Sequence, residues 1–335
     1  MRTRRCNRAL QSATIIASTC LLLSQAAAQS RPAGSPPGYP LKPIRIIVGF
    51  PAGGVADVGA RTVAQKLSES LAEPVIVENR SGAGTILAVE RVATSAPDGY
   101  TLLLMGSTAT IQATFRRKLS YDLERDLAPI ALLMTAPFLV VVRPSLPAHD
   151  MKELIAMARA EPGKLNYGSN GVGSTSHLAG ALIDITANVK MVDVSYKGGA
   201  ENVIAAASGE VTFSFTGVPT ALPLIKAGRL RALAVTSARR LSFLPDIPTV
   251  SESGLPGYAM VPWYGLAAPA GVRKDIVELL NSLAVKAVNT SEIKASFSKQ
   301  GIEVQTSTPQ QFAAFIRSEI VRNARLMKAA GVAPE

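Results

Sequence analysis

The chain has 335 residues, of which 47% are hydrophobic and 18% charged, and its formal net charge is +11. Its length permits one large domain or two ordinary ones, each with an ample hydrophobic core. This composition excludes an intrinsically disordered chain, and the 26 Gly and 22 Pro are too scattered for a collagen-like or low-complexity repeat.

The first 28 residues have the features of a secretory signal peptide. Arginines at positions 2, 4, 5 and 8 precede a mostly apolar run over 9–23, and Ala26-Ala27-Ala28 offers a small-residue cleavage site. The apolar run is too short to cross about 30 Å of hydrocarbon. We therefore expect cleavage rather than a membrane anchor, export to the periplasm, and a mature chain that begins at Gln29.

Both cysteines, Cys6 and Cys20, lie within this leader, so the expected mature chain has no thiol and no disulfide. That excludes cysteine nucleophiles, thiolate metal sites and thiol redox chemistry. The leader holds four arginines and no acid, and its removal lowers the net charge from +11 to +7. A positive net charge suits a small anionic ligand. The sequence has no dense basic run with interleaved aromatic residues, which would be the sign of binding to nucleic acid.

After the leader, residues 29–40 are rich in Pro and Gly and indicate a linker. Apolar runs typical of buried strands then alternate with stretches of helical spacing. We expect strands over residues 44–50, 75–78, 101–105, 138–142, 165–167, 211–215 and 230–236, and helices over 58–71, 86–93, 151–160, from 175, and over 201–208. A last helix is marked by Thr308 as its N-cap, Pro309 at its first position and Gln311 completing a capping box. This alternation predicts an α/β fold with mainly parallel sheets.

A glycine-rich loop follows the first expected strand and precedes a helix. Paired glycines let backbone N–H groups approach a ligand, and a helix N-terminus favours negative charge. The glycine spacing matches neither a Walker loop nor a dinucleotide fingerprint, and a plain tight turn is the alternative. The candidate ligand-binding residues here are Pro51, Ala52, Gly53, Gly54, Val55 and Asp57. The Asp57 carboxylate would repel an anion, so it either caps the helix or receives the ammonium group of an amino-acid ligand.

A second polar, glycine-rich loop lies between the expected strand at 165–167 and the helix from 175. Its hydroxyl and N–H groups favour a second anion site over a merely capped loop, with the candidates Ser169, Asn170, Gly171, Gly173, Ser174 and Thr175. Small polar residues also follow two other strands, giving the candidates Ser107, Thr108 and Thr216. In open α/β sheets, ligands bind beyond the carboxyl ends of the strands. We therefore expect these loops to converge on one cleft.

The sequence offers no convincing catalytic group. Ser174 or Ser176 with His177 is the one tempting pair, but residues so close in a helix point apart. No Gly-x-Ser-x-Gly elbow is present, and His149 follows a Pro-containing loop. No spacing of carboxylates or histidines builds a metal site, so we expect no catalytic residue, no metal and no cofactor.

Taken together, the motifs resemble those of the Bug family, the periplasmic substrate-binding proteins of tripartite tricarboxylate transporters. The resemblance covers nearly all of the expected mature chain in order. The motifs are Pro51-Ala52-Gly53-Gly54 with Asp57 and Arg61, then the segments 77–84, 97–102, 121–122, 166–169, 177–178, 196–199, 233–236, 244–250, 254–258 and 263–265.

The resemblance implies a type II, Venus-flytrap binding protein of two domains joined by two chain crossings. We expect residues 41–130 and 240–335 to form one domain and 131–239 the other. The resemblance also implies a carboxylate-bearing ligand, which includes amino acids, held in the cleft by backbone amides, hydroxyls and water. The implied partners are membrane subunits of the transporter, and a monomer is the default state.

Four residues depart from the family pattern. Thr110 and Gln112-Ala113 stand where relatives often carry a His and an Asn-Pro pair, and Leu87 replaces a usual glycine. No relative's ligand is therefore carried over to this chain. Two rival functions use the same residues: a receptor that signals to a sensor, and a secreted hydrolase that would need His177 as its base.

Overall fold

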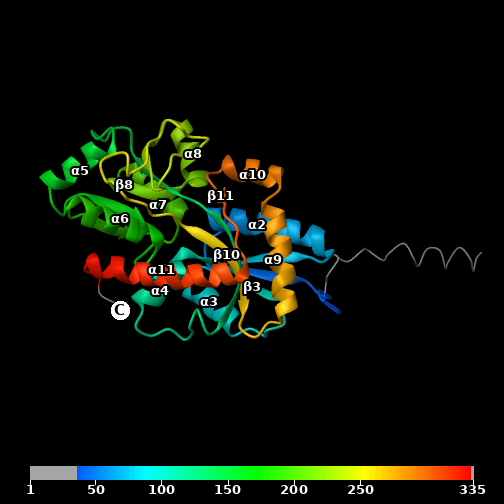
Figure 1. Ribbon diagram of the computed structural model, residues 1–335. Helices are drawn as coiled ribbons and strands as arrows, with labels where there is room; N and C mark the ends of the chain where they lie inside the picture. The colour runs from blue at the N-terminus through cyan, green and yellow to red at the C-terminus, as the bar shows by residue number, and fades with distance from the viewer. Residues whose placement is uncertain (1–35, 333–335) are drawn as a thin grey trace, which may run out of the picture.

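Two β-sheets, each covered by helices, organise the computed structural model, which describes residues 36–332 (Figure 1). The first sheet has the strand order β11-β4-β10-β3-β1-β2 and defines what we call the first lobe. Its strands are β1 (Ile44–Val48), β2 (Val75–Asn79), β3 (Thr101–Gly106), β4 (Leu127–Thr135), β10 (Trp263–Pro269) and β11 (Glu303–Val304). The predicted signal peptide, its cleavage site and both cysteines lie outside the described residues.

The second sheet, with the order β7-β6-β8-β5-β9, defines the second lobe. Its strands are β5 (Phe138–Val142), β6 (Asn166–Ser169), β7 (Val192–Ser195), β8 (Phe213–Gly217) and β9 (Arg231–Val235). Its helices are α5 (Met151–Ala160), α6 (Thr175–Ala187), α7 (Gly199–Ser208) and α8 (Val218–Lys226). The two-lobed α/β architecture expected from the sequence is thus confirmed.

The first lobe's helices bury apolar faces of helical spacing. These helices are α2 (Val55–Leu71), η1 (Ala83–Thr85), α3 (Ile86–Ala93), α4 (Ser107–Phe115), α9 (Lys274–Val288), α10 (Ser291–Ser298) and α11 (Pro309–Ala329). In α2, Val63, Leu67 and Leu71 follow one another at four-residue intervals, and each is at most 2% exposed. Burying each such side chain contributes roughly 1.5–3 kcal/mol.

The chain passes between the lobes twice, as expected. The first crossing is residues 136–137, between β4 and β5, and the second is residues 261–262, just before β10. The Ala136 N–H donates to the Pro262 carbonyl over 2.8 Å, so the two crossings lie side by side. These two adjacent segments connect the sheets, and helix α11 also extends from the first lobe to the second.

Both crossings come later in the chain than the sequence indicated. Residues 131–135 belong to β4 of the first sheet, and residues 241–260 pack on the second sheet, where Tyr258 donates to the Ala179 carbonyl over 3.0 Å. Residues 130–142 are apolar with few interruptions, so the sequence does not show where the chain leaves the first sheet and enters the second. Tyr39, assigned to the linker, is 3% exposed and donates to the Gly99 carbonyl over 2.8 Å.

The expectation of mainly parallel sheets is wrong. Of the nine strand pairings in the described residues, four are parallel and five antiparallel. Helical crossovers connect β1, β2 and β3, and likewise β6, β7 and β8, which makes those neighbours parallel. Every antiparallel pairing involves β4, β5 or β10, the strands next to the crossings, which enter their sheets without such a connection.

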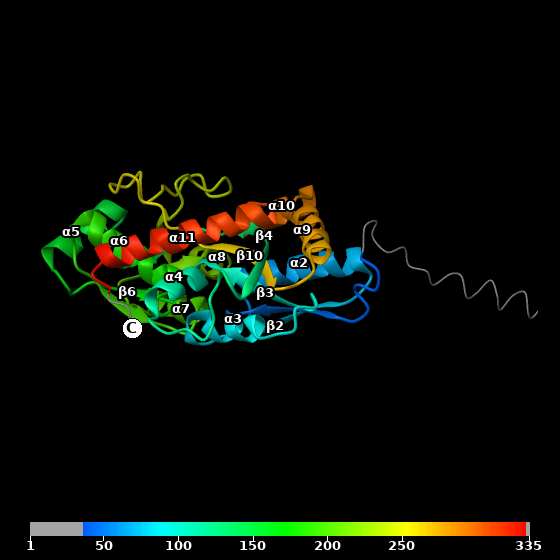
Figure 2. The same cartoon turned by 60° about the horizontal axis from the view of Figure 1, so that its bottom comes forward.

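Helix α11 runs along both lobes, as both views show (Figures 1 and 2). Its predicted capping box is present: the Gln311 N–H donates to Thr308 Oγ1 (3.2 Å), and the Thr308 N–H donates to Gln311 Oε1 (2.9 Å). Phe312 packs in the first lobe against Trp263, whereas Met327 lies in the core of the second. One helix therefore supports both halves of the molecule.

Candidate functional site

The glycine-rich loop after β1 leads directly into α2, which begins at Val55 rather than at the expected residue 58. Gly54 is the N-cap, with extended backbone angles and no side-chain cap, so N–H groups of the first turn lack an intrahelical or capping partner. Gly53 has a φ of 82°, in the left-handed region that glycine adopts readily. The loop therefore presents main-chain N–H groups at the start of a 17-residue helix.

Asp57 holds this loop in place from inside. Its carboxylate, 4% exposed, accepts hydrogen bonds from the Gly53 N–H (3.0 Å), Asn79 Nδ2 (2.9 Å) and two nitrogens of Arg61 (3.0 and 2.9 Å). Burial acts to raise the pKa of Asp57, but the hydrogen bonds from Arg61, Gly53 and Asn79 and the Arg61 charge together lower it. Asp57 is therefore neither the N-cap nor positioned to receive an ammonium group, because its acceptor sites are used.

The Pro51 side of this loop contacts the second lobe. A Cβ atom on Gly198, the N-cap of α7, would lie 3.1 Å from Cγ of Pro51. A Cβ on Gly217, the N-cap of α8, would lie 2.7 Å from Cγ2 of Val55. Glycines at both positions thus allow the lobes to approach closely, and we call this boundary the interlobe seam.

A second contact across the seam joins α4 to α6. Ser107 Oγ and Thr175 Oγ1, at the first positions of the two helices, are 2.7 Å apart, and Thr108 Oγ1 is 3.4 Å from the same Thr175 oxygen. All three side chains are buried. Residues 107–110, expected to be loop, are therefore the first turn of a helix whose N-cap, Gly106, has no side-chain cap.

Helix N-termini consequently gather at the seam. Five of the helices in residues 36–332, namely α2, α4, α6, α7 and α8, begin with residues that make these contacts between lobes. Four of the five have a glycine N-cap without a capping side chain. Each N-terminus carries about half a positive charge, so the seam concentrates positive potential without a lysine or arginine at its centre.

Hydrogen bonds within the second glycine-rich loop shape it. The Gly171 N–H donates to Ser169 Oγ (3.1 Å), and the Asn170 N–H donates to Ser176 Oγ (2.9 Å). Gly171 and Gly173 both have left-handed backbone angles. The Asn170 Oδ1 atom is buried and has no partner among the described residues. At the end of β8, Thr216 Oγ1 lies 2.7 Å from Thr220 Oγ1. Thr175, at the end of the second loop, and Gly217, next to Thr216, make the contacts that place these segments at the seam.

Comparison with known proteins identifies the group of this chain. Residues 59–332 match the family described as the tripartite tricarboxylate transporter family receptor. The chain belongs to this family. This receptor is 35% identical to protein BugT of Bordetella pertussis over 88% of this chain and 90% of that protein. It also resembles the R. palustris protein Rpa4515 with adipate (TM-score 0.85, 32% identity, covering 89% of this chain and 100% of that one) and MatC from Rhodopseudomonas palustris with bound malate (TM-score 0.79, 30% identity, 86% and 99%).

Membership confirms the resemblance to the Bug family and its periplasmic binding-protein fold. Receptors of this family are periplasmic substrate-binding proteins and not enzymes. Over residues 36–332, no helix has the length and apolar character needed to span a bilayer. The same stretch holds no cluster of three His, Cys, Asp or Glu residues placed to bind a metal ion.

His177 of the receptor faces the loop backbone and not a serine nucleophile. Its Nδ1 accepts from the Gly173 N–H (3.4 Å), while Ser174 Oγ accepts from the backbone N–H of His177 (3.2 Å). Burial lowers the pKa of His177, and the Asp193 charge opposes this effect only partly. A neutral imidazole that braces the second loop accounts for these contacts.

Gln112 is a residue of the receptor's seam that sequence reasoning did not include in the site. It lies one turn after Thr108 on α4, is 1% exposed, and donates from Nε2 to the Val172 carbonyl of the second lobe (3.3 Å). Its Oε1 is buried without a partner among the described residues. A side chain on Gly84 or on Gly173 would overlap the Gln112 amide. The departure from the family's Asn-Pro pair at this position was the available signal.

A strained segment lies beside Gln112. Ala83, Gly84 and Thr85 have consecutive left-handed φ values of 46°, 61° and 75°. Such a value is a genuine outlier for a β-branched residue, and strain of this kind is often located at functional sites. Thr85 Oγ1 is also buried and unpartnered in the described structure. Local sequence patterns do not reveal this strain.

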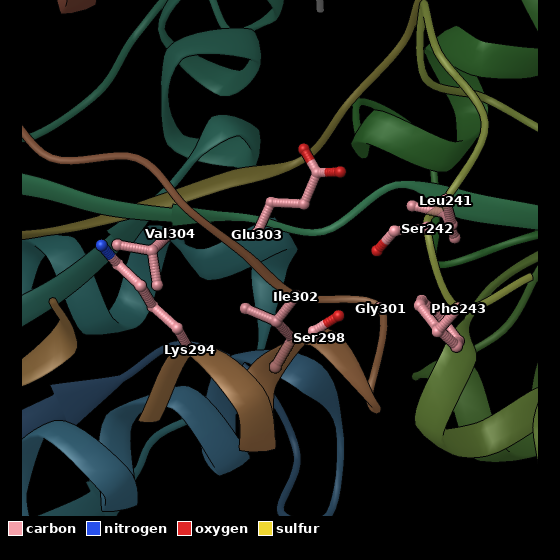
Figure 3. Close-up of a pocket in the computed structure, with 9 residues that line it drawn as sticks. All are labelled: Leu241, Ser242, Phe243, Lys294, Ser298, Gly301, Ile302, Glu303 and Val304. Carbon is pink, nitrogen blue, oxygen red and sulfur yellow. The ribbon is translucent and has the colours of Figure 1, made fainter. Parts of the chain in front are cut away.

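The pocket in Figure 3 is a different feature. It has a volume of about 210 Å³ and lies between residues 241–243 of the second lobe and the α10–β11 region of the first. Phe243 faces Ile302 and Ser298 across it, with Lys294 and Glu303 at the side (Figure 3). It shares no residue with the interlobe seam, so the predicted ligand-binding residues do not line it.

Proposed function

We propose that this receptor captures a small carboxylate-bearing organic anion at the interlobe seam and delivers it to the membrane subunits of a tripartite tricarboxylate transporter. The observation that carries the proposal is the gathering of five helix N-termini at the seam. An anion near one such terminus gains about 0.3–1 kcal/mol when exposed, and up to about 2 kcal/mol when partly buried. Several termini acting together favour a carboxylate over a neutral solute.

The electrostatics of the first loop are consistent with this ligand. Arg61 neutralises the Asp57 carboxylate at 2.9 Å, so the one buried acid of the loop does not repel an anion. The candidate contacts remain Pro51–Val55 in the first lobe, Ser107 and Thr108 on α4, and the loop residues 169–175 with Thr216 in the second lobe. Two relatives of known structure hold dicarboxylates, adipate and malate, which supports a carboxylate for this chain.

Because residues from both lobes form the seam, the ligand would make its full set of contacts only in the closed arrangement. A ligand shifts an open–closed equilibrium by its differential affinity for the two states. The membrane partner would then recognise the closed, loaded receptor. This step belongs to the proposal and follows from the family, whose transporters have membrane subunits.

A thermal-shift screen of organic acids, including adipate and malate, tests the ligand class. A ligand at about one hundred times its Kd stabilises the folded state by about 2.7 kcal/mol, which is a clear rise in Tm. Isothermal titration should then give one site per chain. Neutral sugars and cationic amines are the controls, and a response to these without any response to carboxylates would refute the ligand class. Loss of uptake of the identified acid on deletion of the transporter's membrane subunits tests delivery.

A further inference from the structure

A groove lies on the outer side of α11. Its volume is about 670 Å³, and its walls come from α11, from α6 and from residues 257–259. Three arginines, Arg317, Arg322 and Arg325, line it together with Val321, Leu182 and Leu326. We call it the arginine groove, and we propose that it docks an acidic, amphipathic segment of a partner protein. The inference does not depend on which solute the seam binds.

The groove carries a surplus of positive charge. Arg317 and Arg325 are exposed and make no ion pair within residues 36–332. Arg322 pairs with Glu319 over 3.2 Å and donates to the Ala259 carbonyl over 2.8 Å. Glu319 is 8% exposed and also accepts from Trp263 Nε1, so it is committed to the interior. Two guanidinium groups therefore remain available for a partner's carboxylates.

Apolar contacts lie between these charges. Arg317, Val321 and Arg325 follow one another at four-residue intervals and share one face of α11. Val321 is 51% exposed, and Leu182 and Leu326 are partly buried on the groove's walls. A partner segment with an apolar side chain flanked by acids would match this arrangement in both shape and charge.

Other occupants match less well. A membrane surface is flat, whereas these arginines line a concave groove. A second copy of the chain docked by the same patch would place arginine against arginine, because a two-fold interface pairs each surface with itself. A small inorganic anion could not contact guanidinium groups spread over more than two turns of one helix, and the apolar walls would add nothing to its binding.

The groove also bridges the lobes. The α11 residues that line it lie between Ile316, which packs in the first lobe, and Met327, which packs in the second. Leu182 and the segment 257–259 belong to elements that pack on the second sheet. A segment seated there lies on α11 where this helix passes from one lobe to the other. The groove is thus suited to a partner that must recognise how the lobes are arranged.

Binding of a short fluorescent peptide, with leucines spaced among glutamates, tests the proposal by anisotropy. We expect saturable binding that weakens with salt, an affinity about tenfold lower for R317E/R325E, and a severalfold loss for V321S. The matched control R91E/R229E reverses two exposed arginines elsewhere, carries the same change in net charge, and should bind like the unaltered protein. A peptide with lysine in place of each glutamate should not bind.

Equal affinity of both double variants for the acidic peptide would overturn the proposal. The proposal would also be overturned if the peptide failed to bind and anionic phospholipid vesicles bound the unaltered protein but not R317E/R325E. That result would assign the groove to a membrane. If gel filtration showed a dimer that only the R317E/R325E substitutions dissociate, the groove would be assigned to contact with a second copy of the chain. Melting curves of each variant verify folding. An unchanged response of the variants to organic acids would show that the groove and the proposed solute-binding site are independent.

Discussion

Replacing Gly54 with Asp would place a negative charge at the N-terminus of α2 without disturbing the fold. Gly54 has extended angles (φ −83°, ψ 174°) that any residue adopts, and a Cβ there would lie 3.9 Å from its nearest neighbour, the Pro51 carbonyl oxygen. Asp is a preferred N-cap residue and exceeds Gly by only a few tenths of a kcal/mol. We therefore expect the Tm of G54D to be equal to, or slightly above, that of the unaltered protein.

Binding of the anion should respond in the opposite direction. Two unit negative charges roughly 6 Å apart repel by about 2–3 kcal/mol at an effective dielectric constant near 20, which corresponds to about a hundredfold loss of affinity. The matched variant G54N has nearly the same size and capping ability without the charge, so it should lose far less. Isothermal titration of both variants with the acid found by screening measures the difference. Equal affinities of G54D and G54N would refute the assignment of this helix N-terminus to the anion site.

Three further predictions concern the seam, the segment beside it and the C-terminal half of α6. Ser107→Ala removes the buried 2.7 Å contact with Thr175, so solute affinity should fall about fivefold, as titration would show; an unchanged Kd would mean that this contact does not stabilise the closed arrangement. Gly84→Ala forces a methyl group against the Gln112 amide and should lower the unfolding free energy, measured in urea, by about 1–3 kcal/mol. Adding Gln112→Ala to this variant should restore about 1 kcal/mol. If the effects of the two substitutions on the unfolding free energy were strictly additive, they would contradict the packing described here. Burial raises the pKa of Asp184 to about 6, above its unfolded value of 3.8, so the folded state gains stability as the pH falls from about 6 towards 4. Asp184→Asn should remove that gain and, because the group is only partly buried, raise the unfolding free energy at pH 8 by about 1 kcal/mol; parallel stability–pH curves for the two proteins would contradict it.

Several helices and one strand could be predicted from sequence because their signals are local. Helices Ile86–Ala93 and Met151–Ala160 and the strand Phe138–Val142 were predicted with the observed bounds, and the capping box of α11 was read from three residues. In each case periodicity or capping chemistry lies within the segment itself.

Features that depend on tertiary structure could not be predicted in this way. The first turn of α4 looks like loop in sequence, but Asn323 of α11 donates to Thr110 over 3.0 Å and helps to hold the helix in place. The parallel or antiparallel sense of a strand depends on where the chain changes sheets, which the apolar run around Ala136 does not mark.

The same limit applies to the site. The loops around Gly53 and Gly173 were expected to converge on one cleft, but sequence reasoning weighed only two helix N-termini. That five meet at one seam follows from topology. Gln112 was noted in the sequence only as a departure from the family pattern, and its role at the seam follows from its contact with the Val172 carbonyl 60 residues away.

The helix that follows the capping box constrains how this molecule opens. Its 21 residues make a rod about 30 Å long, pinned by Phe312 at one end and by Met327 at the other. A rod fastened at both ends permits the halves to swing about it but resists their pulling apart along its length. We therefore expect that solute entry requires a rotation of limited amplitude between the lobes. We expect the packing around the flexible Met327 side chain to adjust during this rotation.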